Sequence, residues 1–348
     1  MSSTNATESN HSGPSRRWTA AKFALPLLVL IALGVLPQIA SLVDDPFLVR
    51  VGIRIMILAI AASSLNFILG YGGMVSLGHA AFIGVAAYAV GILNWHLGNG
   101  EPLLSWPLVI EGSANIWIVA PVAIIASALA ALIIGFVSLR TSGLHFIMIT
   151  LAFDQMLYYF FVSLQKYGGD DGTQLIEPLR AGTTELTNRI FIYYIVFTTL
   201  LGVLFLIDRI VESNFGLVLQ GCRQNERRLT AVGYRTYNYK LVAFVIAGSI
   251  AGVSGVLLAT AQQFVSPSDL AWSRSGELVI MLAIGGVGTL FGPVLGALAY
   301  VLFEVVLESW TIHWQVIFGP ILVLFVLGTK GGILGSLESF GWGLKGHD

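Results

Sequence analysis

Two carboxylic acids stand inside strongly apolar stretches of the sequence. Asp154 lies in ITLAFDQMLYYF, beside Gln155, and Glu304 lies in AYVLFEVVLES. An ionised carboxylate at the centre of a bilayer costs about 3 kcal/mol on the mildest scale, so these side chains should face the protein interior, water or a partner. They could carry protons or cations along a transport pathway. Alternatively, Asp154 could hydrogen-bond a neighbouring helix, and Glu304 could lie near the membrane surface and be hydrated.

A second polar feature is the stretch GCRQNERRLTAVGYRTYNYK at 221–240, which carries six charged side chains. From 214 to 234 the pattern predicts a short amphipathic helix that Gly233 ends in a left-handed C′ position. Asn225 interrupts its apolar stripe, which consists of Val218, Cys222, Leu229 and Val232. The stripe could pack against lipid headgroups or in a groove on a soluble protein, and the scarcity of bulky apolar anchors favours the protein.

No nucleotide-binding or hydrolytic motif occurs in the sequence. GxxxxGK[ST], GxSxG and HExxH are absent, so energised transport would require another chain to hydrolyse the nucleotide. With a single cysteine and isolated histidines, we expect no disulfide and no metal site. The net charge of −1 gives no basic field for nucleic acid.

The composition is that of a membrane protein. Hydrophobic residues make up 56% of the chain and charged residues 11%, against about 25% charged in soluble domains. Apolar stretches suited to crossing about 30 Å of hydrocarbon occur near 22–43, 49–69, 80–97, 116–138, 143–165, 190–207, 241–263, 276–290, 293–310 and 315–329. We therefore predict an all-α integral membrane protein with about ten transmembrane helices. The short stretches 276–290 and 315–329 could be half-helices or a bent pair.

The positions of Lys and Arg orient this bundle. With the N-terminus inside, twelve of the 18 basic residues fall on the inner side, which by the positive-inside rule makes both termini cytoplasmic. The predicted organisation is a disordered cytoplasmic tail at 1–21, a transmembrane domain at 22–330 and a second cytoplasmic tail at 331–348. The sequence of the transmembrane domain includes a cytoplasmic coupling loop at 208–240.

Glycine recurs every four residues in the stretch 285–300, a spacing that lets membrane helices approach closely. A second interpretation is that Gly285, Gly286 and Gly288 break the helix and expose backbone to a cavity. The segment GYGGMVSLGHAAF at 70–82 is likewise either a binding or gating loop or a tight turn. Asn66, just before it, is predicted to hydrogen-bond between helices. Asn66 and Gln155 are also candidate pathway residues, together with Asp154, Glu304 and the glycines 285, 286 and 288.

Several segments in order resemble one family. In chain order they are GYGGMVSLGHAAFIGVAAYAVGIL, LRTSGLHFIMITLAFDQMLYYF, YGGDDG, QNERRLTAVGYRTYNYKLVAFVIAGSIAGVSGVLLA, SGELVIMLAIGGVGTLFGPVLGA and WQVIFGPILVLFVLGTKGGILG, and they are spread over residues 70–335. They are similar to the LivM-type permeases of branched-chain amino acid ABC importers. The tripeptide Thr329-Lys330-Gly331 departs from the family pattern at its first two positions, because the family more often has Pro-Arg-Gly there.

The resemblance implies a multi-pass subunit of a bacterial inner membrane, with a fold similar to the ten-helix permeases of the vitamin B12 importer class. Its partners would be a LivH-type second permease, two cytoplasmic ABC ATPases that use the ATP, and a periplasmic substrate-binding protein. The loop after the sixth span carries the coupling helix in such importers. The matching positions here are Glu226, Ala231 and Gly233, and the residues expected to flank the ATPase contact are Arg223, Asn225 and Arg227.

The resemblance also bears on the substrate. Relatives that carry urea or short amides tend to have a basic residue in the glycine stretch, whereas this chain has Val287, which favours branched-chain or other neutral amino acids. The alternatives are a urea or short-amide importer and a secondary transporter driven by an ion gradient, with Asp154 and Glu304 as its ion sites. The subunit itself is not expected to be an enzyme or to bind a cofactor.

Overall fold

The computed structural model describes residues 16–43, 45–102, 112–182, 184–311, 313–328 and 331–335, and these residues are mostly helical. The α-helices are α1 (Arg16–Val43), α2 (Pro46–Asn66), α3 (His79–Asn99), α4 (Ile116–Ser138), α5 (Leu144–Ser163), α6 (Arg189–Val211), α7 (Asn214–Ala231), α8 (Thr236–Gln262), α9 (Trp272–Gly285), α10 (Gly292–Glu308) and α11 (Trp314–Gly328). The shorter elements are the π-helix η1 (Phe67–Tyr71), the 3₁₀ turns η2 (Gln165–Tyr167) and η3 (Pro267–Leu270), and the strands β1 (Thr173–Gln174), β2 (Arg180–Ala181), β3 (Thr184–Glu185) and β4 (Phe264–Val265).

Seven of the described helices are long and apolar enough to cross a membrane: α1, α2 continued by η1, α3, α4, α5, α6 and α8. The apolar helices α9, α10 and α11 have 14, 17 and 15 residues. They therefore reach only roughly 21–26 Å at 1.5 Å per residue. Each of the ten predicted stretches coincides with a helix, so the all-α prediction is confirmed. The predicted number of complete crossings is confirmed only in part.

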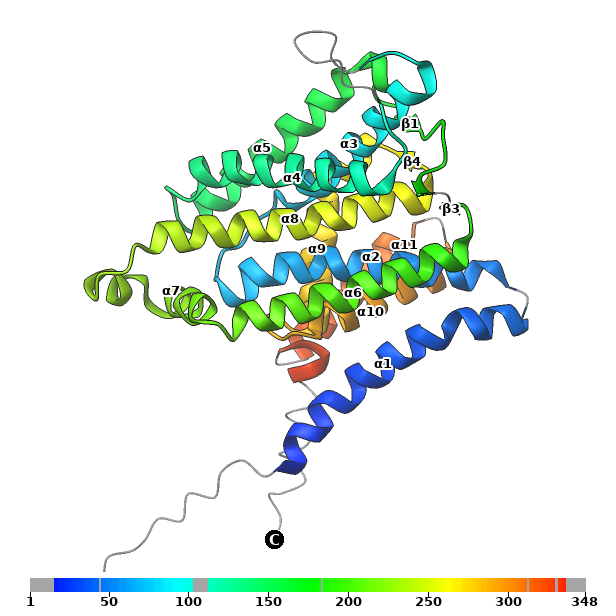
Figure 1. Cartoon of the computed structure of the whole chain (residues 1–348). Coiled ribbons are helices and arrows are strands. Elements are labelled where there is room, and N and C mark those ends of the chain that lie inside the picture. Colours follow the sequence, from blue (N-terminus) through cyan, green and yellow to red (C-terminus); the bar gives the residue numbers. More distant parts are fainter. Residues whose placement is uncertain are drawn as a thin grey trace, which may run out of the picture.

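Helix α2 is the central helix of the bundle and packs against α6, α8 and α10 (Figure 1). Its spanning segment is 89% buried, whereas the spanning segments of α1 and α4 are 33% buried. From Ile55 to Ala62 the helix is apolar on every side and buried, which suits this position because no polar face there needs solvent. The outer faces of α1 and α4 are apolar and exposed, as lipid contact requires.

The two ends of the bundle differ. Helix α7 lies at one end, and the short strands β1, β3 and β4 lie at the other (Figure 1). β1 and β4 pair antiparallel, with Thr173 opposite Val265. After β4 the chain turns back into the protein, and a Cβ atom placed on Gly84 of α3 would lie 2.0 Å from Leu270 Cγ of η3. The absence of a side chain at Gly84 therefore lets this returning segment pack inside the bundle.

The termini differ in part from the predicted tails. Helix α1 begins at Arg16, so residues 16–21, which we predicted as part of the disordered tail, are helical. At the other end, a Cβ atom on Gly332 would lie 2.7 Å from Gly286 N, so residues 331–335 pack back onto the bundle. The predicted tail residues 1–15 and 336–348 lie outside the described residues, as do Thr329 and Lys330.

Candidate functional site: the α7 element and the glycine segments

Helix α7 is two helices joined at a bend. Ser213 caps the first by accepting a hydrogen bond from Gly216 N at 3.4 Å. Asn225 has extended backbone angles (φ −160°, ψ 93°), which end that helix. Its Oδ1 then accepts a hydrogen bond from Arg228 N at 3.1 Å, the geometry of an N-cap. The predicted interruption at Asn225 is therefore the start of a second helix of about two turns.

This bend makes the predicted single apolar stripe wrong. Val218 and Cys222 are buried on the first helix, but Val232 is 75% exposed beyond the second. Leu229 instead folds back toward the first helix, since a Cβ atom on Gly221 would lie 3.0 Å from its Cδ1. Periodicity across a bend cannot give a common face, and only the first helix contributes its apolar side to the bundle. We call residues 214–233, which include the C-terminal Gly233, the coupling element.

The coupling element ends as the sequence predicts. Gly233 has a φ of 99° and stands just beyond the helix. Its N donates to Thr230 O at 3.0 Å, and Tyr234 N donates to Leu229 O at 3.1 Å. These two bonds form a Schellman motif, which favours glycine because a Cβ atom is strained at positive φ. Ala231 and Gly233 are both exposed and free to meet another surface.

Glu226 joins the coupling element to α8. Its Oε2 accepts a hydrogen bond from Lys240 Nζ at 2.6 Å, and the side chains of Glu226 and Lys240 are 44% and 17% exposed. Partial burial acts to raise the pKa of Glu226. The hydrogen bonds from Lys240 and Thr236 and the charge of Lys240 outweigh that effect, so this pKa lies below its ordinary value. Glu226 is therefore ionised at neutral pH and fixes the second helix to the start of α8.

Two glycine-rich stretches meet beside α7: the first glycine segment, 70–73, and the second glycine segment, 285–292. The buried side chain of Asn66 joins them, as predicted for an interhelical hydrogen-bonder. Its Nδ2 donates to Thr289 O at 2.8 Å, and its Oδ1 accepts from Gly288 N at 2.9 Å. A Cβ atom on Gly70 would lie 2.6 Å from Gly288 N, so the two backbones are in direct contact.

The second glycine segment interrupts the helices as the sequence indicates. Helix α9 ends at Gly285 and α10 begins at Gly292, and between them Gly286 and Gly288 have φ values of 119° and 80°. The first glycine segment also leaves regular α geometry, since η1 is a π-helix, a form that often marks functional positions. That this irregular backbone lines a transport pathway stays a prediction.

Arg223 does not point only outward from the coupling element. Although the residue is exposed overall, its Nη1 donates a hydrogen bond to Gly70 O. A Cβ atom on Gly288 would lie 3.3 Å from the same Nη1. Arg227 and Asn225 are exposed. The structure thus brings together Arg223, which was predicted to flank the ATPase contact, and Gly288, which was predicted to expose backbone to a cavity.

Asp154 is fully buried and is held by a neighbouring helix, which was one of the two interpretations from sequence. Its Oδ1 accepts a hydrogen bond from Ala81 N at 2.9 Å in the first turn of α3. Ser275 Oγ accepts from Ala80 N at 2.8 Å in the same turn. First-turn amides have no partner within their own helix, so α5 and α9 supply it. Gln155 is half-buried beside Asp154.

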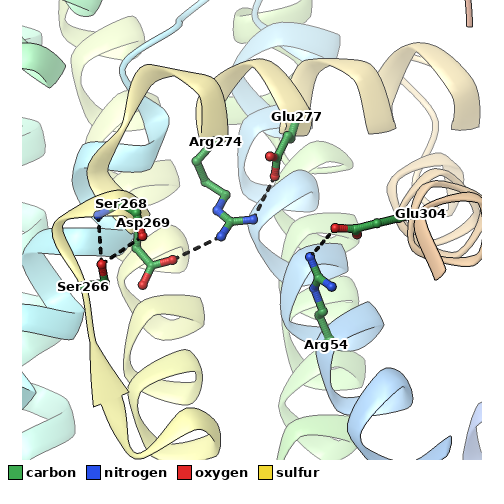
Figure 2. Close-up of polar contacts among 7 residues, drawn as sticks. All are labelled: Arg54, Ser266, Ser268, Asp269, Arg274, Glu277 and Glu304. Atoms are coloured by element: carbon green, nitrogen blue, oxygen red, sulfur yellow. Dashed lines mark hydrogen bonds and ion pairs between the residues drawn. The ribbon is translucent and has the colours of Figure 1, made fainter. Parts of the chain in front are cut away.

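Glu304 is also paired inside the protein. Its Oε1 lies 2.8 Å from Arg54 Nη2, an ion pair between α10 and α2 (Figure 2). The residue is only 7% exposed, so hydration at the membrane surface is not what satisfies it. Sequence reasoning missed Arg54 as its partner. The signal was available, because Arg54 stands within the predicted apolar stretch 49–69, where a charge needs a partner.

A second ionic group was not predicted from the sequence. Figure 2 shows Arg274 between Asp269 of η3 and Glu277 of α9, with N···O distances of 3.2 and 2.8 Å. Asp269 is 4% exposed. A buried carboxylate of this kind is stable when a guanidinium compensates its charge. The group therefore fixes the returning segment 266–271 to the start of α9.

These features define a class of protein. In the described part of the chain, the seven helices of spanning length, the apolar outer faces, the broken helices and the ion pairs within the bundle are those of a multi-pass membrane protein. The profile of the family described as "Branched-chain amino acid transport system / permease component" matches residues 47–327. The chain belongs to this family, whose members are transport subunits.

Individual relatives agree with the family. The high-affinity branched-chain amino acid transport system permease protein LivM of Escherichia coli (strain K12) is 25% identical over 331 residues, which cover 88% of this chain and 74% of that protein. A probable branched-chain amino acid transport permease protein LivM of Methanocaldococcus jannaschii is 26% identical over 72% of this chain and 78% of its own. The Escherichia coli (strain K12) permease LivH is 26% identical over 40% of this chain and 46% of its own.

No solved structure matches this chain. The likeness to the vitamin B12 importer fold therefore stays an expectation from the sequence resemblance. The family assignment rests on the sequence, and the broken helices and the α7 element describe how this member is built.

Proposed function

We propose that this chain is the permease subunit of an ATP-driven importer for branched-chain or other neutral, hydrophobic amino acids. The coupling element faces the cytoplasm and contacts an ABC ATPase through Glu226, Ala231 and Gly233, with Arg223, Asn225 and Arg227 beside them. Both termini are cytoplasmic, and the membrane is the inner membrane of a bacterium. The other subunits are a LivH-type permease, two ATPases and a periplasmic substrate-binding protein.

The observation that carries this proposal is the coupling element, in a chain whose family is that of amino acid permeases. It is a capped, bent helical unit at one end of the bundle, with exposed residues on its second helix (Figure 1). Its fixed shape supports a role as a docking surface, because a rigid surface loses less conformational entropy on binding. Since the sequence contains no nucleotide-binding motif, the docked protein would be the one that hydrolyses ATP.

The ion-gradient alternative receives less support from the buried acids. Asp154 caps α3 and Glu304 pairs with Arg54, so each has a structural partner. The energy source separates the two functions. In proteoliposomes that hold the assembled complex, we expect leucine uptake with binding protein and internal ATP, and none with a proton gradient alone. Gradient-driven uptake without ATP would contradict the proposal. Uptake of urea in place of leucine would support the alternative of a urea or short-amide importer.

Glu226→Gln tests the coupling role directly. The neutral side chain can accept a hydrogen bond from Lys240 but cannot form an ion pair with it, so we expect uptake to fall by about tenfold, within the usual range of coupling energies. The loss of stability should stay within about 1 kcal/mol, because Glu226 is 44% exposed. Proteoliposome uptake and thermal unfolding in detergent measure the two effects. Unchanged uptake would remove Glu226 from the coupling surface.

The lowered pKa of Glu226 also determines the pH range over which its ion pair with Lys240 is intact. A depressed carboxyl pKa adds stability above the ordinary value of about 4.3, and that stability is lost as the pH falls through the lowered pKa. The wild-type ion pair should therefore be intact between about pH 6 and 8. We expect the ratio of Glu226→Gln to wild-type uptake to be constant across that range. A ratio that approaches one toward pH 6 would show that Glu226 loses its charge there.

A further inference from the structure

We infer that Arg223 is a positioning residue that transmits movement of the coupling element to the two glycine segments, rather than a contact for the ATPase. The inference rests on the proposed function. It adds to it the residues that connect the coupling element to the glycine segments. It starts from the position of Arg223 at the end of the first helix of α7, two residues before the bend at Asn225. Movement of the second helix therefore reaches the bundle through Arg223 as well as through the ion pair of Glu226 with Lys240.

The glycine segments leave room for the Arg223 side chain. A Cβ atom on Gly73 would lie 2.9 Å from Arg223 Cγ, and one on Gly288 would lie 3.3 Å from Arg223 Nη1. Gly73 also has a φ of 70°, which any other residue would adopt only under strain. These two glycines therefore allow the guanidinium to reach Gly70 O, to which it donates a hydrogen bond. The carbonyl accepts a charge-assisted bond, the stronger type.

From Gly70 the connection continues by direct contact. Gly70 lies in η1, and its backbone touches that of Gly288. Asn66, at the start of the same π-helical turn, holds Gly288 N and Thr289 O with one amide group. A displacement of Arg223 therefore acts on Gly70 and on the break between α9 and α10 together. The π-helix is a suitable place for this, because a π-bulge is a local departure from regular α-helical geometry.

The experiment uses the complete complex in proteoliposomes and compares Arg223→Ala, Arg223→Lys and Asn66→Ala. For Arg223→Ala we expect the ATPases to copurify normally and to hydrolyse ATP, with uptake reduced by about tenfold. Hydrolysis should no longer respond to loaded binding protein. Arg223→Lys should restore part of that response, because an ammonium can still donate to Gly70 O. Arg209→Ala is the matched control, as Arg209 is an exposed arginine in the last turn of α6.

The double variant Arg223→Ala with Asn66→Ala tests whether both residues act along one route. If they do, uptake by the double variant should be no lower than uptake by the less active of the two single variants, because the effects of coupled residues do not add. Independent, multiplying losses would overturn the inference. So would loss of ATPase copurification in Arg223→Ala, which would make Arg223 a docking contact, and so would normal uptake. If the wild-type complex takes up no amino acid, the proposed function fails instead.

Discussion

Gly285→Ala is expected to prevent stable packing of α9 against α10. A Cβ atom at this position would lie 1.8 Å from Gly292 O and 2.9 Å from Gly296 N, and both are backbone atoms. Neither can move aside without displacing α10, so the cost should exceed the roughly 1–3 kcal/mol typical of overpacking. We expect a large loss of folded protein, measured by size-exclusion chromatography and thermal unfolding in detergent.

The matched control is Gly202→Ala in α6. A Cβ atom on Gly202 would meet no atom within 4 Å, and alanine favours a helix by about 0.5–1 kcal/mol over glycine. This variant should unfold at the wild-type temperature or slightly above it. If Gly285→Ala and Gly202→Ala had the same stability, the close approach of α9 and α10 would not be a feature of the folded protein.

Asp154→Ala is expected to have the second large effect. The substitution removes the acceptor for Ala81 N and leaves a buried amide unpaired. An unsatisfied buried donor costs about 1–3 kcal/mol, and the empty volume adds to that. Asp154→Asn retains the oxygen acceptor for Ala81 N but places an amide NH2 group where Asp154 Oδ2 has no partner among the described residues, so it should lose less stability than Asp154→Ala. Thermal unfolding of both variants in detergent measures the difference.

Uptake by the same two variants separates a structural from an ionic role for Asp154. In the structural role, Asp154→Asn transports amino acid at a rate near wild type, and Asp154→Ala loses transport together with stability. If Asp154→Asn were stable but unable to transport, the negative charge itself would be needed. That result would return the ion-gradient alternative to consideration.

Much of the fold follows from the sequence because it depends on local features. The apolar stretches predict helices, and the cap at Gly233 follows from a glycine placed after an amphipathic run. The break at Gly285, Gly286 and Gly288 is equally local, since the glycines create it. The bend at Asn225 was visible as an interruption but not as a second helix, because an N-cap and a polar residue in mid-helix look alike in sequence.

The remaining features depend on contacts between distant residues. Nothing near Glu304 in the sequence identifies Arg54 as its partner, 250 residues away. The same holds for the contact between Arg223 and Gly70, which are 153 residues apart. The sequence did indicate that the stretch 276–290 could be a half-helix, and α9 has 14 residues. Where α9 begins was less evident, because the returning segment before it sets that end.

The start of α3 has a mechanical consequence for transport. Two of its first-turn amides are satisfied by Ser275 of α9 and Asp154 of α5. If either helix slid away from α3, a bare amide would be left in a dry interior, at a cost of about 1–3 kcal/mol for each. We therefore expect α3, α5 and α9 to move as one rigid body during alternating access, with the flexibility of the subunit concentrated at the edges of this trio.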